Sequence, residues 1–147
     1  MIELMAVVAI ISILVTISLA LYQDYVSRSR WSDNVAQVGS IKQAVAECVN
    51  SNRGQVAPGR CDAIPNLITA QFLPSNFVTP SNATSRYLAA PVSVTNGVIT
   101  LIGSNLASNC VVAFTPTTTA GQAAISWNIT TNALPAGCNR SKTGFGQ

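Results

Sequence analysis

The sequence lacks histidine and has few charged residues, and both shortages exclude chemistry. Only 9% of its 147 residues are charged, against roughly 25% in an average soluble protein. Without histidine there is no Ser-His-Asp or Cys-His nucleophile pair and no histidine-ligated zinc. All acidic residues lie at or before Asp62, so the second half cannot hold paired catalytic carboxylates or a carboxylate cage for calcium. We therefore expect a non-enzyme without cofactor or metal ion.

The beginning of the chain is a long apolar stretch. Residues 4–23, LMAVVAIISILVTISLALYQ, contain no charged residue, and at about 1.5 Å per residue they match a bilayer core roughly 30 Å thick. A cleaved signal peptide would need a basic start and a small-residue cleavage site, which this stretch lacks. The pattern predicts a membrane-spanning helix. Glu3, just before it, either needs a cationic partner or lies among the headgroups, where a helix N-terminus favours negative charge.

Helical periodicity continues beyond the apolar stretch. One stripe of apolar residues recurs at steps of three and four, which predicts a helix that lies on a folded domain; its members are Trp31, Val35, Val38, Ile41, Val45 and Cys48. Most polar residues of this segment, Asn34 among them, are expected to lie off the stripe. The run ends at Asn50-Ser51-Asn52-Arg53-Gly54, a suitable C-terminal stop. We expect one continuous helix of about 50 residues, roughly 75 Å long.

The rest of the chain predicts strands. Asn96-Gly97 separates two β-prone runs and is a preferred two-residue hairpin turn. This turn would place Val94 opposite Ile99 and Val92 opposite Leu101. Further strands are expected at 110–115 and 125–129, where the residues of the latter alternate in polarity. We predict an α+β fold, in which a roughly four-stranded antiparallel sheet covers the amphipathic half of the helix.

The four cysteines allow three disulfide connectivities. We favour Cys48–Cys61, which would tie the helix end to the following loop, and Cys110–Cys138, which would attach the C-terminal segment to a strand. Four buried free thiols are the alternative. Disulfides indicate a periplasmic or extracellular domain, whereas Arg28 and Arg30 after the span would place that domain in the cytoplasm by the positive-inside rule. A basic leader preceding this sequence would resolve the conflict.

The start MIELMAVVAIISIL and the following YQDYVSRSR resemble the N-terminus of type IV pilins, specifically the type IVa class. The resemblance is dense over residues 1–30 and architectural beyond them, including a C-terminal Leu134-Pro135-Ala136-Gly137-Cys138 that is similar to the disulfide-bounded loop of pilins. It implies a structural subunit that polymerises through its N-terminal helix. Glu3 matches the glutamate thought to neutralise the N-terminal amine of a neighbouring subunit. We expect the other assembly contacts on the same helix, at Leu4, Val7, Val8, Ile11 and Leu14.

The resemblance also implies partners and places. A prepilin peptidase would remove a short leader and methylate the new N-terminus, which is Met1 only if Met1 is the mature start. Subunits would wait in the inner membrane, and assembly machinery would then extract them into a cell-surface helical homo-oligomer used for adhesion, twitching motility or DNA uptake. A host surface or DNA would be the further partner. Residues 1–26 would form the protruding helix and filament core, and residues 27–147 the periplasmic and then extracellular domain.

Four departures from the family pattern qualify these expectations. The family pattern usually has phenylalanine and one further residue before the position of Met1; if Met1 is the mature start, the spacing from the amine to Glu3 is shorter than in the family. Ser12 and Ala20 stand where the family commonly has glycine and proline, so we expect less loss of helix in a filament. Asn128 replaces a common cysteine, which leaves Cys110 as the partner of Cys138. The major subunit is our first expectation; a minor pilin, a secretion-system pseudopilin and a DNA-binding or adhesive subunit are the alternatives.

Overall fold

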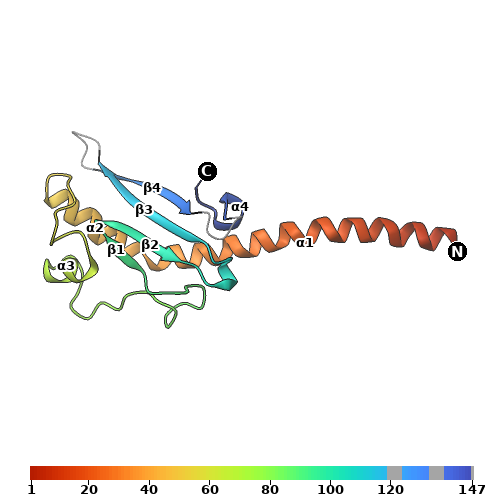
Figure 1. Cartoon of the computed structure of the whole chain (residues 1–147), viewed down its shortest axis with the longest axis horizontal. Helices are drawn as coiled ribbons and strands as arrows, with labels where there is room; N and C mark the ends of the chain where they lie inside the picture. The colour runs from red at the N-terminus through yellow and green to blue at the C-terminus, as the bar shows by residue number, and fades with distance from the viewer. Residues whose placement is uncertain (119–123, 133–137, 147) are drawn as a thin grey trace.

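The computed structural model describes residues 1–118, 124–132 and 138–146. Helix α1 (Ile2–Gln37) protrudes from one end of a folded domain, with Met1 at its free tip (Figure 1). The domain holds α2 (Gly39–Ser51), the short α3 (Ile64–Thr69), a sheet, the 3₁₀ turn η1 (Asn105–Ala107) and α4 (Arg140–Thr143). This is the α+β arrangement that the sequence predicts.

The long helix is interrupted once, so the expectation of one continuous helix was wrong in this detail. Val38 has φ −93° and ψ 5°, outside regular helix geometry, and separates α1 from α2. A β-branched residue followed by Gly39 combines two low helix propensities. The helix resumes at once, because the Lys42 N–H donates to the Val38 carbonyl at 2.9 Å. At the far end, Gly54 adopts φ 81° and donates to the Val49 carbonyl at 2.9 Å, a glycine-type helix end.

The four strands form one antiparallel sheet in sequential order, β1-β2-β3-β4. Their bounds are Ser93–Thr95, Val98–Ile102, Val111–Thr118 and Ile125–Asn132. Asn96 and Gly97 have φ of 51° and 75°, as the predicted two-residue turn requires. Val94 pairs with Ile99 as expected. Val92, expected opposite Leu101, lies before β1, and its N–H instead donates to the Pro80 carbonyl at 2.8 Å.

The core lies between the sheet and the helix stripe. Five of the six stripe residues are buried and Val35 is half-buried. Opposite them, the inner face of the sheet buries Val94, Ile99, Leu101, Val112 and Phe114. Trp127 is half-buried at the edge of this core, and the Lys42 ammonium lies 5.4 Å from its ring and 5.1 Å from the Phe114 ring. These cation–π contacts stabilise the ammonium group of a lysine at the edge of the core.

Asn34 was expected off the stripe and is instead fully buried on it. Its side-chain amide donates to the Tyr87 carbonyl at 3.0 Å, and its oxygen accepts from the Ser85 hydroxyl at 3.1 Å. A buried amide is tolerated only when its hydrogen-bonding groups are satisfied. Asn34 therefore attaches the loop before β1 to the helix, which an apolar side chain could not do.

We predict that Asn34→Leu lowers the free energy of unfolding by about 1–3 kcal/mol, because it removes one hydrogen-bond partner each from the Ser85 hydroxyl and the Tyr87 carbonyl. Urea unfolding of the full chain in detergent measures the change. Asn50→Leu is the matched control: Asn50 is exposed on α2 and should change stability by less than about 0.5 kcal/mol. Equal effects of the two substitutions would contradict the assignment.

The turn between α2 and α3 is held by a disulfide and a carboxylate. Cys48 and Cys61 are bonded, in agreement with the pairing favoured from the sequence. Next to the bond, the Gly59 backbone N–H and then the Asn66 side-chain amide donate to the Asp62 carboxylate and hold its pKa below the ordinary value. Asp62 thus stabilises the fold above its unfolded pKa of about 3.9, and this contribution is lost as the pH falls through the lower folded pKa.

We expect Asp62→Asn to flatten the loss of stability on acidification. Wild type should lose stability between about pH 5 and pH 2 in part through Asp62, and the variant should lose less over the same interval. Thermal unfolding at a series of pH values provides the measurement. Asp33→Asn, at an exposed position, is the control, and an identical pH profile for wild type and Asp62→Asn would contradict the role.

Candidate assembly surface

The protruding half of α1 carries a continuous apolar surface that its own domain does not cover. Among the residues expected to make assembly contacts, Leu4 is 73% exposed, Val7 54%, Val8 59%, Ile11 53% and Leu14 59%. The helix is long and apolar enough to cross a membrane by length and composition, with a mean hydropathy of 2.8 over its most apolar 18 residues and none of these buried. So much unburied apolar surface indicates an environment other than water.

Two hydroxyl groups within this half donate hydrogen bonds to the preceding helical turn, and one carboxylate lies at its tip. The Ser12 hydroxyl donates to the Ala9 carbonyl and the Thr16 hydroxyl to the Ile13 carbonyl, both at 2.8 Å. Bonds of this kind to the preceding turn allow a hydroxyl into an apolar environment. Glu3 lies exposed in the first turn. Its assignment to a cationic partner, and those of Leu4 to Leu14 to assembly contacts, stay predictions, since they concern a second copy.

Where α1 enters the domain, residues 24–31 form a neck that is held from two sides. Trp31 donates its indole N–H to the Ala107 carbonyl at 3.0 Å, and the Arg30 guanidinium donates to the Leu106 carbonyl. The hydroxyls of Ser27 and Ser108 are 3.0 Å apart. On the other side, the Ser141 hydroxyl of α4 donates to the Asp24 carboxylate at 2.8 Å. The η1 turn and α4 together fix the direction in which the apolar half leaves the domain.

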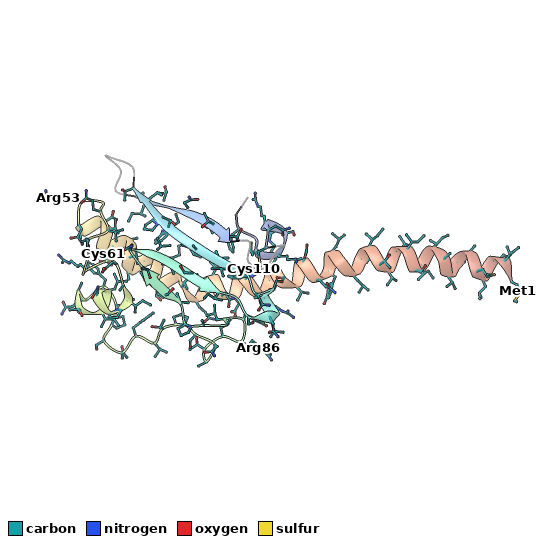
Figure 2. All side chains as sticks on the ribbon, viewed as in Figure 1. Met1, Arg53, Cys61, Arg86 and Cys110 are labelled. Carbon is teal, nitrogen blue, oxygen red and sulfur yellow. A yellow bond between two sulfur atoms is a disulfide. The ribbon has the colours of Figure 1, made fainter. Side chains whose placement is uncertain are left out.

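The second disulfide joins these two holding segments. Cys110 follows η1 and is bonded to Cys138, which precedes α4; Figure 2 labels Cys110 close to the point where α1 leaves the domain. Asn139 then caps α4 by accepting from the Lys142 N–H at 3.3 Å. This pairing agrees with the one favoured from the sequence. The expected loop residues 134–137 before Cys138 lie outside the described residues.

Sequence reasoning named several residues of the neck but did not find the contacts that hold it. Asp24 and Ser141 are 117 positions apart, and no local pattern pairs them. A signal did exist for Asn34: it lies three residues after Trp31 and four before Val38, so it fills a place in the buried stripe that Val35 takes only in part. Spacing alone identifies such a position, whereas residue type argues against it.

No protein-family model matches the chain. Over 97% of its length, however, the chain is 31% identical to the fimbrial protein EcpC of Eikenella corrodens, of which it covers 90%. Over 49 residues, one third of its length, it is 45% identical to the type IV major fimbrial protein FimA of Dichelobacter nodosus, of which these cover 31%. The chain belongs to the type IV pilins. This pilin is also 32% identical over 79% of its length to the prepilin peptidase-dependent protein D of Escherichia coli, of which it covers 69%.

The family membership explains why the apolar half of α1 is exposed. Fimbrial proteins are structural subunits, so this pilin is a structural component of a pilus on the cell surface, and its unburied apolar helix fits association with like helices. The relatives named as fimbrial proteins are structural proteins and not enzymes. Relatives are named both as major and as minor fimbrial proteins, so the names do not decide between these two roles.

We predict that replacing Cys110 and Cys138 together by alanine loosens the neck of this pilin. On the loop-entropy model, loss of a bond that spans 28 residues costs about 3–4 kcal/mol. Hydrogen exchange of the full chain in detergent should speed up in residues 105–110 and 138–146. The paired control, Cys48→Ala with Cys61→Ala, should lower stability by about 3 kcal/mol while leaving exchange at the neck slow. The same exchange profile in both variants would contradict the prediction.

Proposed function

We propose that this pilin is the major structural subunit of a pilus of the type IVa class. Residues 1–26 form the filament core after assembly and span the inner membrane before it, and residues 27–147 form the outer domain. The observation that carries the proposal is the apolar half of α1, which is exposed at nearly every described position. Burial of one such Leu, Ile or Val side chain contributes about 1.5–3 kcal/mol. Lipid before assembly and neighbouring helices after it provide this burial, which the domain does not.

Glu3 sets the axial offset between neighbouring copies in the proposed filament. A carboxylate in an apolar environment is unfavourable unless a cation neutralises it, and a lone helix in lipid offers no such cation between residues 4 and 23. In a bundle of copies, a cationic group of a neighbour reaches Glu3 only at one axial offset. The N-terminal amine of a neighbouring copy is the partner we propose. The contact joins different surfaces of successive copies, and such a contact generates an open helical filament when its rotation does not close into a ring.

The assembly role can be tested with Glu3→Gln, which keeps the shape of the side chain and removes its charge. We expect the yield of sheared surface pili to fall at least about ten-fold, since leaving a buried ion pair without one partner costs several kcal/mol. Electron microscopy counts the filaments, and membrane fractions should retain the subunit. Asp33→Asn removes an exposed acid of the domain and should leave the yield unchanged. Wild-type piliation of Glu3→Gln cells would refute the role of Glu3.

The same preparation of sheared filaments tests whether the chain is the major subunit. If this chain is the major subunit, mass spectrometry of sheared filaments will find it as the predominant polypeptide. Its presence at trace level, or its absence, would instead support a minor pilin or a pseudopilin.

A DNA-binding role gains no support from the arrangement of the basic residues. The basic residues after position 62 are Arg86, Arg140 and Lys142. Figure 2 places Arg86 on the opposite side of α1 from α4, which carries the other two. Nucleic-acid recognition needs basic residues gathered along one track, so these three do not form a common site. Adhesion to a host surface is likewise not favoured by a particular feature.

A further inference from the structure

The fold gathers half of the basic residues of this pilin at the neck. The chain has eight lysines and arginines, and four of them lie on the two elements that meet there: Arg28 and Arg30 on α1, Arg140 and Lys142 on α4. The Ser141–Asp24 hydrogen bond of 2.8 Å holds α4 against α1. Arg28 also lies over the end of α4, because a Cβ added to Gly144 would come within 3.3 Å of its side chain. We call these four residues the basic collar.

The collar is available for a ligand. Arg28 and Arg140 are exposed, and Lys142 is half-buried. Arg30 is braced within the protein, since its guanidinium donates to the Leu106 carbonyl and lies 5.8 Å from the centre of the Tyr87 ring. The acid of the neck, Asp24, already accepts from Ser141. The positive charge of the collar therefore exceeds the negative charge facing it.

The collar lies at a definite depth relative to the apolar span. Tyr22 and Tyr25 are 66% and 72% exposed at the end of the span, where tyrosines are typical of the membrane–water interface. Arg28 follows Tyr22 by six residues, which is about 9 Å along a helix. The headgroup region adds about 5–8 Å on each side of the hydrocarbon core. The guanidinium of Arg28, and α4 beside it, thus reach the level of the lipid phosphates.

We propose that the basic collar binds anionic phospholipid headgroups while the subunit stands in the membrane. The proposal rests on the membrane stage of the proposed function. The positive-inside rule does not explain why Arg28 and Arg30 follow the span on the same side as the domain. In this proposal they lie there because they contact lipid headgroups. α4 adds two more cations from the other end of the sequence, which hydropathy and loop charge cannot detect.

A lipid surface fits the collar better than a second copy does. The cations lie beside the place where the apolar helix emerges, so any bilayer that holds the helix must bring its headgroups to them. A second copy would have to supply carboxylates at the same level, and the exposed acids of the domain, Asp33 and Glu47, lie farther along the helix, beyond the neck. The collar is also separate from Arg53, which Figure 2 shows at the opposite end of the domain.

The test uses the full chain reconstituted in phosphatidylcholine bilayers that contain spin-labelled lipid. Electron paramagnetic resonance gives the association of spin-labelled phosphatidylglycerol relative to spin-labelled phosphatidylcholine. We expect an about five-fold preference for the anionic lipid at low salt, from about one basic contact per bound headgroup. At 1 M salt the preference should fall below about two-fold, because such contacts are screened.

The variant Arg28→Gln, Arg140→Gln and Lys142→Gln should lose the preference, with a ratio near one. Arg30 is left unchanged because it also braces the neck. The matched control, Arg53→Gln with Arg60→Gln, removes two exposed basic residues of the far end and should keep the wild-type ratio. Circular dichroism and intact disulfides verify that each variant is folded.

Three outcomes would overturn the proposal: no preference in wild type, an unchanged preference in the triple variant, or an equal loss in the control. A triple variant that keeps its lipid preference but fails to form pili would assign the collar to contacts between copies. The lipid measurement involves no polymer. It can therefore fail while Glu3→Gln behaves as expected in cells, or succeed while the filament proposal fails.

Discussion

The structure of this pilin depends on the apolar surface that the chain leaves without cover. The first half of α1 is exposed around its whole circumference, whereas the second half buries one stripe under the sheet. A helix with an apolar stripe is stabilised by the domain that it packs on. A helix that is apolar all round needs a continuous apolar environment. The two halves of one helix thus place the protein at the boundary between water and a nonpolar phase, and the neck is where that boundary runs.

The low charge of the chain follows from the same division. The apolar half has Glu3 as its charge, and the outer face of the sheet is built from neutral residues such as Thr115, Thr117, Ser126 and Asn128. Interactions between the domains of neighbouring copies then involve little electrostatic repulsion, even at high local concentration. Asp24, at the neck, accepts a hydrogen bond from Ser141.

Much of the fold could be predicted from the sequence because its signals are local. The apolar run, the 3.6-residue stripe and the Asn96-Gly97 turn each depend on neighbours within a few positions. Asn34 could not be predicted, because a buried amide is stable only through Ser85 and Tyr87, 51 and 53 residues away. The break at Val38 could not be predicted either, because the free energies of a continuous and an interrupted helix differ little at this position. The assembly role of the residues at the tip is predicted from the resemblance alone and stays a prediction, since one chain contains no contact with a second copy.

The arrangement of the neck has a mechanical consequence. A pull along α1, as in a filament under tension, reaches the domain first through η1 and α4, which hold residues 24–31. These two segments are joined by Cys110–Cys138, so separating them from each other would require breaking a covalent bond. Cys110 directly precedes β3, so the same bond also connects the holding segments of the neck to the sheet.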